Sequence, residues 1–514
     1  MRMIPTVLVR GAGLTPDEVL AVARAGAPVE LAPRAIAAMA RSRARVEALA
    51  AGEDPVYGIS TGLGLLASTR IPAGQRSALQ HSVLRSHAAG VGPPVPVEVV
   101  RAMLLLRLRT LATGYTGARP ELARAVADVL NAGITPVVPA HGSLGASGDL
   151  APLAHAGLCL IGEGEAFDRS GRRVPAGEAL AAAGLRPLRL EVKEGLSLIN
   201  GTDGMLGMLL LACADARRLF ATADVAAAMS VEALLGTDRV FAPDLQALRP
   251  HPGQARSAAN LHRLLEGSAI VASHRESQHA VQDSYSLRCA PQVAGAARDT
   301  LDFAEAVASR ELASAVDNPV VLEDGRVESN GNFHGAPLGF ACDFLAVAAA
   351  EVGAIAERRV DRLLDPQRSA GLPAFLAGEP GLDSGLMIAQ YTAAALVAEN
   401  RRLAQPASVD SIPTSGMQED HVSMGWGAAL KLRAVLENVA HVLAIEVVCA
   451  ARAVDLRAPL MPARATAAVR DLLRERVAGP GPDRHVSPEL EEAAGLVRSG
   501  AVLERAAAAA GGLE

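Results

Sequence analysis

The chain has 514 residues, half of them hydrophobic and 3% aromatic, and 49 Lys plus Arg against 55 Asp plus Glu give a formal net charge of −6. Such an apolar content allows a large core and excludes a wholly disordered chain. The acidic balance and the scarcity of aromatic rings argue against a nucleic-acid partner, which would require a basic surface and stacking platforms.

Cysteine usage and the apolar segments bear on the cellular compartment. The five cysteines are odd in number and widely spaced, without a CxxC pair, so we expect free thiols in a reducing cytoplasm rather than disulfides or structural zinc. The first residues, Met1 to Pro5, are followed by no long apolar run, and stretches such as Met205 to Ala214 are shorter than the ~20 residues of a membrane span. We expect a soluble protein with no membrane partner.

Helical signals occupy most of the chain. Thr15-Pro16-Asp17-Glu18 combines a capping box with Pro at the first helical position and predicts a helix that continues to Ala25. Strand signals are limited to Thr6 to Val9 and to a hairpin around Phe167 to Val174, with its turn at Ser170-Gly171. Periodic apolar patterns predict further helices over roughly 33–50, 75–88, 97–113, 120–132, 203–235, 290–315, 338–364, 384–404 and 425–454.

Several of these patterns exceed the usual length of a helix, which is typical of long helices packed in a bundle. The predicted fold is mainly α, in one continuous body. We expect a smaller, loop-rich N-terminal part over residues 1–200 and a bundle of long helices with C-terminal helices over 201–514.

Short segments rich in Gly, Ser, Asn and Asp separate the helices. Functional groups concentrate on loops held by rigid scaffolds, so these segments suggest one shared site. They are residues 57–64, 86–90, 142–149, 200–203, 282–288, 331–334 and 417–424.

The segment Gly145-Ala146-Ser147-Gly148-Asp149 allows three interpretations. It is a tight turn that feeds a helix, with Asp149 as the N-cap and Pro152 in the first turn. It is a phosphate cradle, although the Gly-Lys-Ser/Thr of a P-loop is missing. Or the amide nitrogen of Gly148 attacks the carbonyl of Ala146, and dehydration of Ser147 then gives a conjugated electrophile. Glycine offers that nitrogen the least steric hindrance.

Other polar residues suit such a site, although each has an ordinary structural interpretation as well. Arg288 offers a bidentate fork for a carboxylate, and Tyr57 and Tyr285 offer phenols for proton transfer. His87 and Glu419 offer hydrogen bonds to a polar ring. The histidines at 155, 334 and 421 lack metal-ligand spacing, so we expect no metal.

Taken together, the seven segments resemble the ammonia-lyase family that uses a methylidene-imidazolone prosthetic group. The resemblance covers essentially the whole chain, and its most specific part is the run from Gly145 to His155. It implies that Ala146, Ser147 and Gly148 cyclise autocatalytically to form the group, with no external cofactor. It also implies the helical fold of the fumarase and aspartase group, and a homotetramer whose active sites are shared between subunits.

The resemblance assigns roles to single residues. Tyr57 is similar to the catalytic base, Tyr285 to the second catalytic tyrosine, and Ser147 to the serine that becomes dehydroalanine. Substrate-binding positions are matched by His87, Asn200, Gln282, Arg288, Phe333 and Glu419.

Two of these matches indicate the substrate. His87 and Glu419 suit an imidazole, whose donor and acceptor both need partners. The implied reaction is the non-oxidative elimination of ammonia from L-histidine to trans-urocanate, the first step of histidine degradation. Two positions depart from commonly seen members: Asp203, where Gln is frequent, and Ser284, where Pro is frequent.

Three alternatives stay open. A lyase or aminomutase of the same family could act on phenylalanine or tyrosine, although His87 and Glu419 argue against it. A non-catalytic helical scaffold would be expected to have lost Ser147, Tyr57 or Arg288. An aspartase-like enzyme without the prosthetic group would have no use for the Ala-Ser-Gly triplet.

Overall fold

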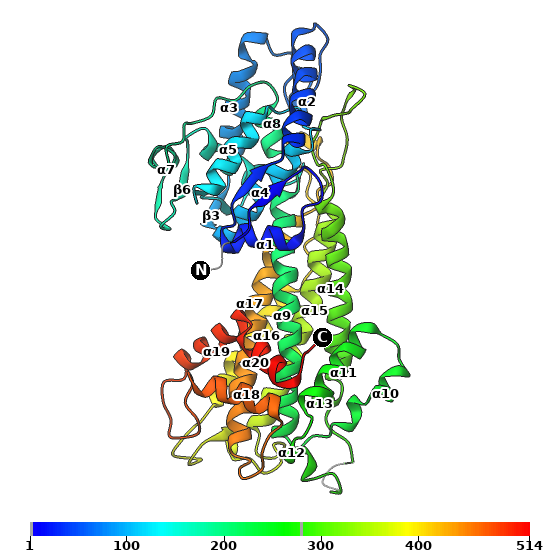
Figure 1. Cartoon of the computed structure of the whole chain (residues 1–514), viewed down its shortest axis with the longest axis vertical. Helices are drawn as coiled ribbons and strands as arrows, with labels where there is room; N and C mark the ends of the chain where they lie inside the picture. Colours follow the sequence, from blue (N-terminus) through cyan, green and yellow to red (C-terminus); the bar gives the residue numbers. More distant parts are fainter. Residues whose placement is uncertain (1–3, 278–280) are drawn as a thin grey trace. The chain divides into compact units, whose positions relative to one another are not determined.

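The computed structural model describes residues 4–277 and 281–514, which form two compact units (Figure 1). The first unit comprises the described residues up to Leu211 together with Glu305–Cys342 and Pro406–Leu430. The second comprises Ala212–Ala304, Asp343–Gln405 and Lys431–Glu514, without the undescribed residues. The first unit thus contains the expected N-terminal part, 1–200, and adds segments from the expected C-terminal part.

The predicted mainly helical architecture is confirmed, including its long helices. These four helices contribute residues to both units: α9 (Asp203–Ala233), α14 (Ala290–Leu312), α15 (Ala336–Leu364) and α17 (Gly425–Asp455).

Helix α4 (Val97–Ala112) is the centre of the first unit, because every residue from Val99 to its end is buried. It packs against α1 (Pro16–Ala25), α2 (Pro33–Ala51) and α5 (Pro120–Asn131). The remaining helices of this unit are α3 (Arg76–His87), α6 (Leu150–Leu160), α7 (Ala176–Ala182) and α8 (Glu194–Ile199), with 3-10 turns at Gly64–Leu66, Ala73–Gln75 and Ser415–Met417.

Small sheets complete the first unit. The predicted strand near residue 7 is β1 (Val7–Val9), which pairs in parallel with β2 (Val29–Leu31). The predicted hairpin is confirmed as the antiparallel pair β6 (Glu165–Phe167) and β7 (Arg173–Pro175), which β4 (Thr135–Pro136) extends. Two further antiparallel pairs are β3 (Val91–Pro94) with β5 (Pro139–His141), and β8 (Val320–Val321) with β9 (Val327–Glu328).

The predicted start of α1 is confirmed in detail. Thr15 Oγ1 accepts a hydrogen bond from the Glu18 amide at 3.2 Å, and Glu18 Oε2 accepts one from the Thr15 amide at 2.8 Å. Two of the amides that a helix start leaves unpaired are thereby satisfied.

The second unit is held by a buried ion pair between its long helices. Arg359 on α15 donates to both carboxylate oxygens of Glu446 on α17, at 2.5 and 2.9 Å, and Ser230 on α9 donates to the same carboxylate at 2.7 Å. The rest of this unit consists of α10 (Pro243–Ala247), α11 (Pro252–Leu264), α12 (Ala269–Ala272), α13 (Tyr285–Arg288), α16 (Met387–Leu403), α18 (Arg464–Arg474), α19 (Ser487–Ser499), α20 (Ala501–Ala510) and 3-10 turns at Arg239–Phe241 and Ala374–Leu376.

Helices α15 and α17 are long and apolar enough, by length and composition alone, to cross a membrane. In their most apolar windows, however, 56% and 78% of the residues are buried inside the protein. Such burial is typical of the core helices of a soluble protein.

Candidate active site

The site is built around a sharp turn between β5 and α6. Ser147 lies at the tip of this turn with a φ of 50°, in the left-handed region that side chains other than glycine rarely adopt. The glycines on either side, Gly145 and Gly148, also have positive φ values, of 75° and 80°. This backbone projects Ser147 out of the turn and toward a cavity.

Both glycines of the turn are required by close contacts. A Cβ atom on Gly148 would collide with the carbonyl group of Gly201, and one on Gly145 would collide with Ser423 Oγ. The Gly201 carbonyl also accepts a hydrogen bond of 2.7 Å from the Asp149 amide. The turn is therefore packed against the segment that leads into α9, which only residues without a side chain permit.

Asp149 connects the turn to the start of α9. Its buried carboxylate accepts hydrogen bonds from the amides of Gly204 and Met205, at 2.8 and 2.9 Å. One interpretation of the sequence made Asp149 the N-cap of α6, and Asp149 does stand at that position, although its side chain makes no capping bond to this helix. The carboxylate instead satisfies the first unpaired amides of a different helix.

Burial raises the pKa of Asp149 from 3.8 to about 7, and the nearby negative charge of Asp203 contributes to this rise. The two amide hydrogen bonds act in the opposite direction, because they favour the charged form, but they do not offset the desolvation.

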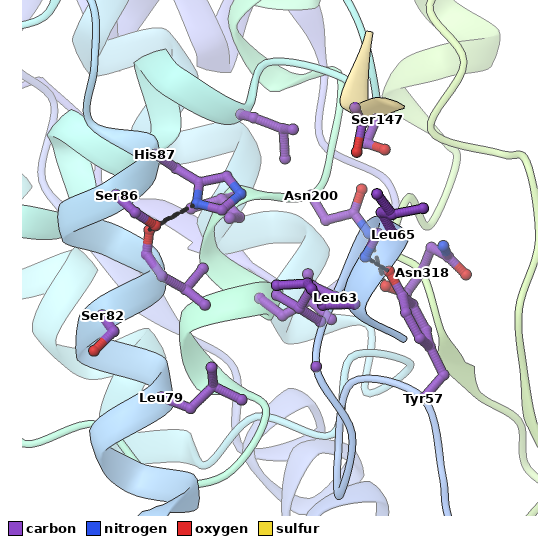
Figure 2. A pocket seen from close by; sticks show the side chains of 18 of the residues that line it. Tyr57, Leu63, Leu65, Leu79, Ser82, Ser86, His87, Ser147, Asn200 and Asn318 are labelled. Atoms are coloured by element: carbon purple, nitrogen blue, oxygen red, sulfur yellow. Dashed lines mark hydrogen bonds between the residues drawn. The ribbon is translucent and has the colours of Figure 1, made fainter. Parts of the chain in front are cut away.

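A cavity of about 500 Å³ opens beside Ser147 (Figure 2). Helix α3 forms one wall and carries His87, while Tyr57 lies on the opposite side. The structure thus brings five of the predicted residues to one cavity: Tyr57, His87, Ser147, Asn200 and Glu419.

The protonation of His87 follows from its contacts. Its Nδ1 lies 2.9 Å from the carbonyl oxygen of Val83 and 3.0 Å from Ser86 Oγ. A carbonyl only accepts hydrogen bonds, so Nδ1 carries the hydrogen and, in the neutral ring, Nε2 is an acceptor. Figure 2 shows the second ring nitrogen directed into the cavity.

Asn200 presents an unsatisfied group in the same cavity. Its Nδ2 donates to the carbonyl of Asn318 at 2.7 Å, whereas its buried Oδ1 has no hydrogen-bond partner among the described residues. A buried acceptor left without a donor costs about 1–3 kcal/mol, and this acceptor lies in the wall of the cavity, where a group with a hydrogen to donate can reach it.

Tyr57 and Glu419 are both half-buried and are held by local contacts. The Tyr57 hydroxyl accepts a hydrogen bond from the Gly64 amide at 3.4 Å. Thr414 Oγ1 donates to Glu419 Oε2 at 2.9 Å. The cavity therefore combines a phenol, an imidazole and a carboxylate, the group types that bind and deprotonate a small polar substrate.

The other predicted residues lie outside this cavity. Phe333 is half-buried in the first unit, and it is not one of the described residues that line the cavity. Gln282, Tyr285 and Arg288 belong to the second unit, where Gln282 lines a different pocket. There the Arg288 guanidinium stacks over the Tyr285 ring at 4.5 Å, and 70% of Tyr285 is exposed.

Sequence reasoning missed several residues that line the cavity. Asn318 was missed although it lies beside Asp317 and Pro319, a combination typical of a tight turn that could have drawn attention to it. The apolar wall gave no signal, because leucines at such positions resemble those of any core. It is formed by Leu63, Leu65, Leu66, Ile71, Leu79, Val83, Leu150, Leu196 and Ile199.

These features define a helical protein in which converging loops enclose a cavity beside a strained serine. The aromatic amino acid lyase family model matches residues 14–475. The histidine ammonia-lyase of Streptomyces coelicolor is 60% identical over 99% of both chains, and that of Gloeobacter violaceus is 51% identical over 98% of both.

Solved structures agree with this match. Tyrosine aminomutase from Streptomyces globisporus superposes with a TM-score of 0.92 at 39% identity, covering 98% of this chain and 99% of its own. Histidine ammonia-lyase from Trypanosoma cruzi superposes with a TM-score of 0.90 at 40% identity, and the match covers 98% of this chain and 95% of the other. The chain belongs to the aromatic amino acid lyase family.

The raised pKa of Asp149 predicts a pH dependence of stability. Between about pH 4 and pH 7 the unfolded chain loses this proton while the folded chain keeps it, so this group destabilises the fold as the pH rises. Asp149→Asn should therefore show a smaller fall in unfolding temperature than the wild type between about pH 5 and pH 7.5.

Differential scanning calorimetry at the two pH values measures the effect. Asp17→Asn, at an exposed position in the first turn of α1, is the control and should follow the wild type. An equal fall in the unfolding temperature of Asp149→Asn and of the wild type would contradict the raised pKa of Asp149.

Proposed function

We propose that this protein eliminates ammonia from L-histidine to give trans-urocanate, the first step of histidine degradation. The observation that carries the proposal is the Ser147 turn, which opens into a cavity that also holds Tyr57, His87 and Glu419. The similarity to histidine ammonia-lyases over nearly the full length of both chains supports the same reaction.

The turn supports formation of the methylidene-imidazolone group from Ala146, Ser147 and Gly148. In that process the Gly148 nitrogen bonds to the Ala146 carbonyl carbon, and the carbonyl oxygen leaves as water. A second water forms from the Ser147 hydroxyl and its α-proton, so no oxidant or reductant is needed. The packing of Gly148 against Gly201 favours the folded-back turn that ring closure requires.

The residues around the turn fit this group. The methylidene carbon of the ring would supply the electrophile for the amino group of the substrate, and the unpaired Oδ1 of Asn200 would accept a hydrogen bond from that amino group. Tyr57 removes the β-proton, which is weakly acidic and needs a positioned base.

His87 and Glu419 select the imidazole ring. With Nδ1 bound to Val83, His87 offers Nε2 as an acceptor for the imidazole N–H of the substrate. Glu419 lies in the same cavity and bonds the other ring nitrogen when that nitrogen is protonated. A phenyl ring would leave both groups without a partner, which penalises its binding.

Arg288, Tyr285, Gln282 and Phe333 complete the site from neighbouring subunits of a homotetramer. Arg288 binds the substrate carboxylate and Tyr285 assists proton or amine transfer. Tyr285 is largely exposed in the single chain, as expected of a residue that serves the cavity of another copy.

Exposed apolar side chains support self-association. Phe303 on α14 and Phe344 and Val347 on α15 are each about half exposed and line one groove of about 840 Å³. An apolar patch of this kind on a soluble protein marks an interface. A cytoplasmic location is supported by the five free cysteines, four of them buried.

The direct test of the function is an ultraviolet assay with histidine, phenylalanine and tyrosine offered separately. Urocanate from histidine should greatly exceed the products of the other two. Equal release of cinnamate from phenylalanine would overturn the substrate, and no release from any of the three would overturn the reaction.

Ser147→Ala should keep the fold and lose nearly all activity, because alanine cannot be dehydrated to the methylidene carbon. Activity in the urocanate assay and circular dichroism check the two parts of this prediction. Ser170→Ala, at an exposed position of the hairpin turn between β6 and β7, is the control and should keep most of the activity. A Ser147→Ala enzyme with near wild-type turnover would refute the role of the serine.

His87→Leu combined with Glu419→Gln should lower histidine turnover and narrow the preference over phenylalanine. Each unpaired contact is worth about ten- to a hundred-fold in selectivity. The ratio of kcat/KM for the two substrates measures this change. An unchanged ratio in a folded double variant would assign specificity to other residues.

Co-expression of two inactive variants tests the shared site. Ser147→Ala mixed with Tyr285→Phe should regain activity, because hybrid tetramers contain some sites with both native residues. Ser147→Ala mixed with Tyr57→Phe should not, because both residues line the cavity of one chain. Equal behaviour of the two mixtures would contradict a site shared in this way.

A further inference from the structure

A buried ion pair lies behind the segment that supports the Ser147 turn. Arg107 on α4 and Asp203 at the start of α9 are 1% and 4% exposed. Arg107 Nε donates to Asp203 Oδ2 at 2.9 Å, and its Nη2 contacts the same oxygen. Arg107 Nη1 also donates to the Ser197 carbonyl at 3.1 Å, so the guanidinium is fixed from two sides.

Gly201 lies between this pair and the turn. A Cβ atom on Gly201 would collide with the Arg107 guanidinium and would lie 2.6 Å from Asp203 Oδ2. The carbonyl group of the same glycine contacts Gly148 and accepts the hydrogen bond from the Asp149 amide. The ion pair, the Gly201 backbone and the turn therefore form one continuous set of contacts.

Further buried polar contacts surround the pair. Thr202, the residue between Gly201 and Asp203, donates through Oγ1 to Glu311 Oε1 at 2.5 Å. The negative charge of Asp203 contributes to raising the pKa of Glu311, as it does for Asp149.

We infer that Asp203 is a positioning residue for formation of the prosthetic group. Together with Arg107 it fixes the Gly201 carbonyl against Gly148 and Asp149, and so holds the turn in the shape that closes the ring. This inference rests on the proposed function. A buried guanidinium requires a charged partner, and the carboxylate of Asp203 supplies it to Arg107.

The test is the rate at which newly made full-length chain loses two waters, followed by intact-mass spectrometry after cell-free synthesis. Asp203→Asn keeps the shape of the side chain and removes its charge. We expect ring formation to slow by about ten- to a hundred-fold, as the loss of a charge-assisted contact allows. Arg107→Lys keeps the charge but loses the planar fork, and it should slow the reaction by a smaller factor.

Asp224→Asn is the matched control, because Asp224 forms a buried ion pair with Arg298 in the second unit. It should lower the unfolding temperature to a similar extent and leave the rate of ring formation unchanged. A purely structural role of Asp203 would give the two Asp→Asn variants the same rate.

The outcomes separate the inference from the function. If the wild type never loses two waters, the proposed function fails. If the wild type loses two waters and the folded Asp203→Asn variant loses them at the same rate, only the inference about Asp203 fails. If Asp203→Asn does not fold, Arg107→Lys decides, and a wild-type rate in that variant would overturn the inference.

Discussion

The close approach of the Gly201 carbonyl to Gly148 is the contact on which the site depends. The carbonyl oxygen lies where a Cβ atom of residue 148 would stand, and it accepts a hydrogen bond from the amide nitrogen of Asp149 at 2.7 Å. Ser147 is thereby held in a left-handed conformation that a serine does not adopt without surrounding support. The conformation of the Ser147 turn is thus a product of packing rather than of local preference.

The fold supplies that packing by bringing distant segments of the first unit together. Asp149 binds the first amides of α9, and Ser423 limits the space at Gly145. Trp426, at the start of α17, donates through Nε1 to the Ala140 carbonyl at 2.8 Å, just before the turn. Helix starts that lie far apart in sequence therefore converge on one loop, where rigid elements position reactive groups well.

The sequence was sufficient for the long helices and for part of the site, but it gave no range for shorter ones such as α11 and α18. Periodicity and the capping box at Thr15 predicted elements that depend on local signals. The partner of the Asp149 carboxylate could not be predicted in this way, because α9 lies more than fifty residues further along the chain. Nor could the leucine wall be predicted, since leucines at such positions resemble those of any core. Tyr285 and Arg288 belong to the second unit and do not line the cavity of the first, so their role beside the cavity stays a prediction.

The central claim is that this packing turns Ala146-Ser147-Gly148 into an electrophile. Tandem mass spectrometry of the peptide that spans the turn, from enzyme shown to release urocanate, tests it most directly. The account predicts that the mass of the native peptide is lower by two waters and that the loss is confined to these three residues. In the Gly148→Ala variant the same peptide should have its full, unmodified mass. An unmodified peptide in active enzyme would contradict the account.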